Sequence, residues 1–221
     1  MQCLDVLEFL LDAGPRSAPV NMAMDEILLK KISRPLLRVY QWNRPTASFG
    51  YFEKYSAVEG EHAGRELVRR WTGGGVVLHG KDFTYSIMAP VDSPLFKSNA
   101  GESYRMIHEQ IVETMRESGM RAWIASAASP KTSSACFENA VRHDILLDQQ
   151  KIAGAAQRRT RFGLLHQGSI QCADLPANFG ARLAEKLAVH VIERPPREGE
   201  QEAAARLSEM KYGADSWLRK Y

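Results

Sequence analysis

Residues 69–86, RRWTGGGVVLHGKDFTYS, bring three glycines together with arginine, histidine and lysine. The spacing of Gly75, Gly80 and Lys81 nearly matches a nucleotide-binding phosphate loop, in which a Ser or Thr after the lysine binds Mg²⁺. Here Asp82 takes that position, and its carboxylate would repel phosphate. The residues that follow, FTYSIM, are aromatic and β-branched and predict a strand, whereas a phosphate loop requires a helix. We therefore exclude a phosphate loop.

The three consecutive glycines, Gly73, Gly74 and Gly75, need another explanation. Glycine loses more chain entropy on folding than other residues, so such a run marks a backbone that takes positive φ or that another group approaches closely. A tight hairpin turn before a strand at 76–79 would satisfy the pattern. A wall of a ligand site would satisfy it equally, and the glycines alone leave both interpretations open.

Cys136 and Lys151 form a second group with possible chemistry. Lys151 begins an expected strand whose next residues, IAGAA, are nearly all small, so a ligand could lie flat on it. A lysine near a thiol lowers the thiol pKa and can polarise a substrate carbonyl. Taken singly, Lys151 also fits a solvent-facing hairpin residue and Cys136 a small buried apolar residue.

The elements that must position these residues alternate between helical and strand periodicity. We expect helices at 21–31 and 102–118, the second with Ile107, Ile111 and Met115 on one face, and a helical region from 176 onward. We expect strands at 35–42, 76–79, 84–88, 144–147, 151–158 and 164–171, and a mobile loop at 126–134.

Composition sets limits on the kind of protein. With 221 residues, 44% of them hydrophobic, the chain can bury one full core, and we expect a single domain over 1–221. Its cysteines, Cys3, Cys136 and Cys172, are odd in number and lack metal-type spacing. We therefore expect neither a disulfide nor a zinc or other metal site.

Charge indicates where the protein works and what it contacts. Asp5, Glu8 and Asp12 interrupt the apolar start of the chain, which argues against a secretory or membrane segment and predicts a cytoplasmic protein. The net charge is only +3, with the basic residues locally dense. This pattern is weak evidence for nucleic-acid binding and favours an acidic protein partner.

Five stretches in order carry a resemblance to a known family: PVNMAMDEILL, RVYQWNRPTASFGYFE, LVRRWTGGGVVLHGKDFTYSIMAP, HDILLDQQKIAGAAQRR and FGLLHQGSIQ. The sequence resembles the lipoate-protein ligase and octanoyltransferase superfamily, which is related in fold to the biotin protein ligases. The resemblance covers roughly residues 21–171. It implies an α+β fold with a mixed, largely antiparallel sheet flanked by helices.

The resemblance also implies roles for particular residues. The implied acyl- or ligand-binding residues are Arg70, Gly73, Gly74, Gly75, His79, Gly154, Ala155 and His166. Lys151 matches the lysine that contacts the acyl carbonyl. The glycines then admit a ligand, and Lys81 has no role in the site.

Two activities within the family are compatible with the chain. Transferases take octanoyl from acyl carrier protein through a cysteine thioester and need no cofactor, whereas ligases activate lipoate with ATP and Mg²⁺. The segment ACFENAVRHD resembles that of the cysteine-dependent, ligase-like octanoyltransferases, with Cys136 as nucleophile, while Cys172 lies too close to Gly168 to match the other octanoyltransferase branch. We also expect no accessory domain of the kind that many ligases carry, since the given sequence ends too soon to contain one. We favour transfer, with ATP-dependent ligation as the alternative and a non-catalytic acyl-binding module as a third interpretation, which the presence of both Cys136 and Lys151 disfavours.

The implied partners are acyl carrier protein and, as acceptor, a lipoyl domain or the glycine-cleavage H protein, with no nucleic acid and no membrane. We expect these acidic carriers to dock on two arginine clusters, Arg65, Arg69 and Arg70, and Arg158, Arg159 and Arg161. The sequence does not decide between an octanoyl and a lipoyl substrate. It also leaves open the identity of the acceptor, the oligomeric state and the base that deprotonates the acceptor lysine.

Overall fold

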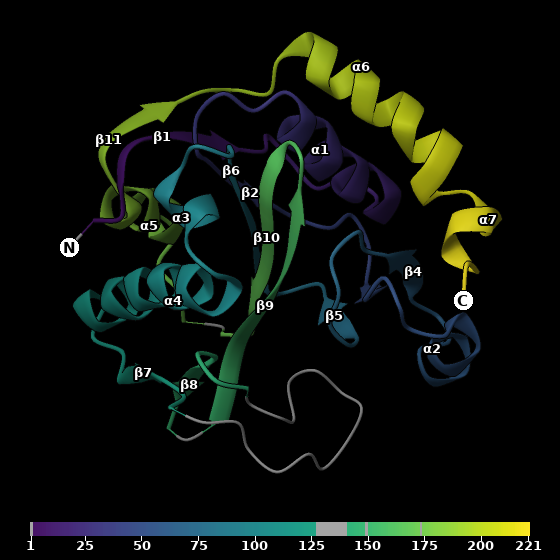
Figure 1. Cartoon of the computed structure of the whole chain (residues 1–221). Coiled ribbons are helices and arrows are strands. Elements are labelled where there is room, and N and C mark those ends of the chain that lie inside the picture. The colour runs from purple at the N-terminus through teal and green to yellow at the C-terminus, as the bar shows by residue number, and fades with distance from the viewer. Residues whose placement is uncertain (1, 127–140, 149, 173) are drawn as a thin grey trace.

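The computed structural model of the chain describes residues 2–126, 141–148, 150–172 and 174–221. Figure 1 shows helices on both sides of a large sheet, with short strands beside it. The strands are β1 (Leu4–Leu11), β2 (Leu36–Tyr40), β3 (Thr46–Phe49), β4 (Glu66–Arg69), β5 (Val77–His79), β6 (Phe83–Ala89), β7 (Ala122–Ile124), β8 (Ile145–Leu147), β9 (Gln150–Thr160), β10 (Gly163–Ile170) and β11 (Ala188–Glu193). The helices are α1 (Ala18–Lys30), α2 (Tyr55–Glu61), α3 (Pro94–Lys97), α4 (Ala100–Glu117), α5 (Phe179–Leu187), α6 (Glu198–Leu207), the π-helical turn η1 (Ser208–Tyr212) and α7 (Asp215–Leu218).

The large sheet is mixed. Within the described residues it contains eight strands in the order β11-β1-β2-β6-β10-β9-β8-β7. Strand β1 pairs in parallel with β11 and β2, and all the other neighbours pair antiparallel. The expected α+β class and the largely antiparallel sheet are therefore confirmed.

Both faces of this sheet are covered. In β2, Leu37 and Val39 pack into one core with helices α4 and α5, while Leu36 and Tyr40 pack into a second core with α1 and α6. Successive side chains of a strand point to opposite faces, so β2, in which every residue is buried, is covered on both of its faces. The sheet is thus the middle layer between two helical layers (Figure 1).

The helices follow the predicted apolar faces, with earlier starts. In α4 the side chain of Asn99 accepts a hydrogen bond from the backbone N–H of Glu102 and caps the helix, and Ile107, Ile111 and Met115 are fully buried as predicted. Helix α1 begins at Ala18, three residues before the predicted start, because a proline in its first turn suits the helical φ. None of the helices in the described parts of the chain is both long and apolar enough to cross a bilayer.

A second, smaller sheet carries the glycine run. Its strand order is β4-β3-β5, so β3 lies between the strands on either side of Gly73–Gly75. A hairpin turn would pair those two strands with each other, and the hairpin interpretation is therefore wrong. The glycine segment instead crosses over one end of β3.

The strands predicted at 84–88, 151–158 and 164–171 correspond to β6, β9 and β10, and since β6 follows Asp82 directly, a phosphate loop is excluded here too. The helical prediction from 176 onward is wrong for β11, which pairs in parallel with β1. Its sequence AVHVIE contains three β-branched residues and favours a strand. Cys136 and most of the loop predicted at 126–134 lie outside the described residues.

Candidate active site

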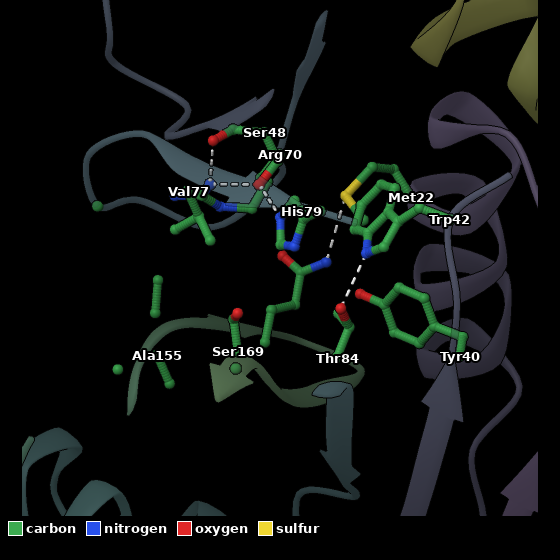
Figure 2. A pocket seen from close by; sticks show the side chains of 15 residues that line it. Met22, Tyr40, Trp42, Ser48, Arg70, Val77, His79, Thr84, Ala155 and Ser169 are labelled. Carbon is green, nitrogen blue, oxygen red and sulfur yellow. Dashed lines mark hydrogen bonds between the residues drawn. The ribbon is translucent and has the colours of Figure 1, made fainter. Parts of the chain in front are cut away.

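A cavity lies where the glycine segment passes over β9 and β10. The empty space inside it, which includes open solvent at its mouth, is about 450 Å³. The side chains and backbone that line it come from α1, both sheets and the glycine segment: Met22, Tyr40, Trp42, Ser48, Arg70, Gly74, Val77, His79, Thr84, Gly154, Ala155, Ala156, Gln167, Gly168 and Ser169. Figure 2 shows Met22, Tyr40 and Trp42 gathered on one side of this cavity, with Val77 and Ala155 on the opposite side.

The glycine segment is folded around the buried guanidinium of Arg70. One terminal nitrogen of Arg70 donates to the backbone oxygen of Ser48 at 2.7 Å and to its Oγ at 2.8 Å. The other donates to the backbone oxygens of Gly73 at 3.0 Å and Gly75 at 2.8 Å. Gly74 takes a φ of 86°, which only glycine adopts readily. Arg70 therefore holds the cavity wall to β3 from within the protein.

A fourth glycine makes this arrangement possible. A Cβ atom at Gly50 would lie 1.8 Å from the backbone oxygen of Gly74, far inside contact distance. The residue that follows β3 must therefore lack a side chain for the glycine segment to lie on it. The stretch RVYQWNRPTASFGYFE includes Gly50, but the need for glycine at this position arises from a contact between segments that are distant in sequence.

His79 is fixed on both ring nitrogens. Its Nδ1 lies 2.7 Å from Asp82 Oδ2 and its Nε2 lies 2.7 Å from Ser48 Oγ, while its ring stacks on Trp42 with the centroids 4.2 Å apart. Burial lowers the pKa of His79 by more than Asp82 raises it, so the ring is neutral at pH 7. With a carboxylate at Nδ1, that nitrogen carries the proton and Nε2 accepts from the Ser48 hydroxyl.

Asp82 organises this side of the cavity. Burial alone would raise the pKa of the Asp82 carboxyl, but hydrogen bonds from His79 and Ser169 and from the Gly80 N–H outweigh it, and the pKa lies below its ordinary value. Its Oδ2 also accepts from the Thr84 hydroxyl at 2.8 Å. The carboxylate that argued against a phosphate loop thus serves as a buried acceptor.

The opposite wall consists of the small residues of β9. Gly154 pairs with Ser169 of β10, and Ala156 pairs with Gln167. Cross-strand partners share a face of the sheet, so Gly154 and Ala156 lie on the face that lines the cavity.

Lys151 lies beside this wall. Its Nζ pairs with Asp144 Oδ2 at 2.8 Å, and the two side chains are only 5% and 1% exposed. A Cβ atom at Gly154 would lie 3.0 Å from Lys151 Cε and 3.2 Å from its Nζ. The solvent-facing interpretation of Lys151 is therefore wrong, and its ammonium group lies next to the part of the cavity wall that Gly154 forms.

The family model described as the lipoyl protein ligase A/B catalytic domain matches residues 17–208. The chain belongs to this family. The matched range contains every residue that lines the cavity and both of the candidate reactive residues, Cys136 and Lys151.

Curated members of the family are similar in sequence. The octanoyltransferase LipM of Staphylococcus aureus is 35% identical over 176 residues, which are 72% of this chain and 64% of that protein. The octanoyltransferase LipM of Bacillus subtilis is 36% identical over 179 residues, 72% of this chain and 63% of that protein. The chain thus spans less than two thirds of the length of these relatives.

Solved structures of family members share the fold. A lipoate-protein ligase A bound with ATP superposes with a TM-score of 0.75 at 20% identity and covers 99% of each chain. The bi-partite lipoate protein ligase of Thermoplasma acidophilum, described with its E2 lipoyl domain, superposes with a TM-score of 0.73 at 19% identity, over 100% of this chain and 98% of that one. At such identities the likeness shows the fold alone, and the expected lipoate-ligase fold is confirmed.

The residues predicted from the family resemblance fall into three groups. Arg70, Gly74, His79, Gly154 and Ala155 all line the cavity. Gly73 and Gly75 lie behind it and contribute their backbone oxygens to Arg70. His166 is fully buried beside Tyr85, on the face of β10 opposite Gln167, and Cys136 is outside the described residues.

Two site residues escaped the sequence interpretation. Asp144, which pairs with Lys151, stood in the quoted segment HDILL, and Tyr104, which donates to Asp144 at 2.6 Å, stood on the predicted helix α4. A buried acid 7 positions before a lysine gives no periodic signal, and the tyrosine is 40 positions from its partner.

Among the described residues, no three His, Cys, Asp or Glu side chains are placed to hold a metal ion.

The arginine clusters differ from the docking prediction. Arg69 is fully buried and donates to the backbone oxygens of Tyr51, Glu53 and Leu218, and Arg70 is only 6% exposed. Neither guanidinium can form a docking surface, so that part of the prediction is wrong. Arginine buries well when backbone oxygens surround its planar head, and sequence proximity does not reveal this.

Proposed function

We propose that the chain is an acyltransferase. It moves an octanoyl or lipoyl group from an acyl carrier protein, through a thioester on Cys136, to a lysine of a lipoyl domain or H protein. The curated relatives named octanoyltransferase support the proposal through their sequence identity, and the family membership supports the acyl chemistry.

The observation that carries the proposal is the cavity together with the ammonium group beside it. The glycine and alanine wall of β9 leaves room for an extended chain, and the rings of Tyr40 and Trp42 with Met22 provide apolar contact on the other side. Lys151 lies next to Gly154, where the carbonyl end of such a chain would meet a positive charge. This arrangement suits an acyl tail with a reactive carbonyl at the Lys151 side.

In the proposed reaction the thiolate of Cys136 attacks the carbonyl carbon of the donor thioester, and the carrier's thiolate leaves as the new carbon–sulfur bond forms. Lys151 donates a hydrogen bond to the carbonyl oxygen as that oxygen gains charge, and its ammonium group favours the thiolate. The amine of the acceptor lysine then forms the amide and displaces Cys136. The proton that this amine loses balances the thiolate that departs.

Intact mass after incubation with octanoyl-carrier protein tests the proposal. We expect a protein heavier by one octanoyl group, formed without ATP and absent in Cys136→Ala, which should keep the wild-type melting temperature because the change removes one sulfur atom. A parallel incubation with lipoate, ATP and Mg²⁺ tests the alternative. Lipoylation of a lipoyl domain that requires ATP and survives Cys136→Ala would replace the transferase proposal with ATP-dependent ligation.

A further inference from the structure

A half-buried tyrosine and a buried aspartate lie behind the lysine of the site. We propose that Asp144 and Tyr104 are positioning residues that hold the Lys151 ammonium group against Gly154, at the carbonyl end of the cavity. This inference rests on the proposed acyl transfer. It assigns to two residues outside the cavity lining the task of keeping the lysine charged and correctly placed.

Every oxygen of the Asp144 carboxylate has a partner. Oδ2 pairs with Lys151 Nζ at 2.8 Å and accepts from the backbone N–H of Val141 at 2.7 Å, while Oδ1 accepts from the Tyr104 hydroxyl at 2.6 Å. His143, directly before Asp144, takes a φ of 75°, and its backbone N–H donates to the oxygen of Ala125 at 2.9 Å. The turn that presents the carboxylate is therefore held in an unusual conformation by the backbone around it.

Tyr104 connects this carboxylate to the cavity wall. Its hydroxyl donates to Asp144 and accepts from the backbone N–H of Ala155 at 2.9 Å. Strand β8 pairs with β9 only as far as Ala153, so Tyr104 takes the place of a strand neighbour for Ala155. One hydroxyl thereby fixes both the acid and the wall along which an acyl chain would lie.

The local path of β9 brings the lysine to the same place. Ile145 pairs with Ala153 and its neighbour Leu146 pairs with Lys151, so Ile152 is an extra residue, a bulge in the strand. Bulges change the direction of side chains. Gly154 then leaves space for Lys151, since a Cβ there would lie 3.0 Å from Lys151 Cε and 3.3 Å from Asp144 Oδ1.

The other titratable groups around the pair are neutral at pH 7. Burial lowers the pKa of His108 on α4 to about 4 and lowers that of His166 on β10 well below its ordinary value. Burial, with the nearby Asp144, raises the pKa values of Tyr104 and of Tyr85 on β6. His143, at the surface, has its pKa lowered by burial and by nearby arginines. Among the described residues around the lysine, Asp144 is then the counter-charge.

Removal of that charge has a consequence with a definite sign. A buried ammonium group without a carboxylate loses its proton more easily, by as much as ~3–5 pH units for fully buried lysines. Because the proposed reaction needs the ammonium form, Asp144→Asn should lose activity at a lower pH than the wild type does on the alkaline side. Replacement of a residue with a merely structural role would reduce activity without moving the pH profile.

The experiment measures single-turnover acylation by intact mass between pH 6 and 9 for wild type, Asp144→Asn and Glu26→Gln. Glu26 is a matched control, since it is a buried carboxylate that accepts from Tyr212 at 2.7 Å and Lys211 at 2.6 Å and lies outside the site. We expect Asp144→Asn to acylate about 100-fold more slowly at pH 8, the scale for a misplaced reactive group. We also expect the alkaline limb of the pH–rate profile of Asp144→Asn to move down by at least about one pH unit, while Glu26→Gln keeps the wild-type profile.

A second pair of variants covers the case in which Asp144→Asn does not fold. Tyr104→Phe leaves the ion pair intact, and Tyr212→Phe removes a tyrosine–carboxylate hydrogen bond of similar length elsewhere. We expect acylation to fall about tenfold in Tyr104→Phe alone, with a smaller shift in the same direction. Wild-type profiles in Asp144→Asn or Tyr104→Phe, or losses equal at every pH, overturn the positioning role. A wild-type protein that never forms an acyl-enzyme overturns the proposed function itself.

Discussion

The contact between Gly50 and the glycine segment gives the sharpest test of how the cavity is built. In Gly50→Ala the added methyl carbon would start 1.8 Å from the backbone oxygen of Gly74, about 1.6 Å short of the 3.4 Å at which ordinary contact begins. The partner atom is backbone, so no side-chain rotation relieves the overlap. The segment must therefore move away from β3 by more than about 1 Å.

Two effects of that movement can be estimated. Overpacking of this kind costs about 1–3 kcal/mol, which lowers the melting temperature of a chain this long by about 2–12 °C. A shift of ~1 Å in a site can cost 10²-fold in rate, so acylation should fall about 100-fold. The hydrogen bonds from Arg70 to Gly73 and Gly75, now 3.0 and 2.8 Å, would stretch with the segment.

The assay compares melting temperature and octanoyl transfer in Gly50→Ala and Gly14→Ala. A Cβ atom at Gly14 meets nothing within 4 Å, and Gly14 is not among the positive-φ glycines, so this control adds the same methyl group without a clash. If Gly50→Ala melts and transfers like Gly14→Ala, then the segment does not rest on Gly50 and the account of the cavity wall is wrong.

Two further predictions concern the lysine and the buried histidine. Lys151→Met should slow acylation by about two orders of magnitude, the scale for one lost oxyanion donor. Lys151→Arg should be slow as well, because a planar guanidinium does not place its charge where an ammonium does. Wild-type acylation in both variants would remove Lys151 from the mechanism. Because burial lowers the pKa of His108 to about 4 from an ordinary 6.5, the unfolded chain binds a proton below pH 6.5 that the folded chain does not. Its contribution to stability is therefore present above pH 6.5 and falls by about 2 kcal/mol by pH 5. The melting temperature of His108→Gln should depend less on pH over this interval, and an equal dependence would contradict the reasoning.

The sequence predicted most of the elements that have a strong local pattern. The apolar face of α4 and the strands β6, β9 and β10 follow from periodicity, since one or both faces of each are buried. The predicted residues that line the cavity came from motifs whose glycines and small residues have a clear steric purpose. Those parts of the site depend on residues that are neighbours in the chain.

What the sequence did not reveal depends on contacts between distant segments. The glycine segment was open to a hairpin interpretation because nothing local shows that β3 lies between its two flanking strands. Arg69 was placed on the surface because its backbone acceptors come from two other parts of the chain, at Tyr51 and Glu53 and at Leu218. Asp144 and Tyr104 were missed for the same reason, since their partnership exists only when α4 lies beside β9.

The polar residues around the cavity have a consequence for which chains it accepts. The indole N–H of Trp42 is bonded to Thr84, the amide of Gln167 to Thr72 and Asp25, and both nitrogens of His79 to their partners. These three groups already have partners inside the protein, so a hydroxyl on an entering tail would give up water without gaining a hydrogen bond from any of them. The penalty for an unpaired buried hydroxyl is about 1–3 kcal/mol, or roughly 5- to 150-fold in binding. Among the described residues of the lining, these bonds already made inside the protein therefore disfavour tails that carry a hydroxyl group.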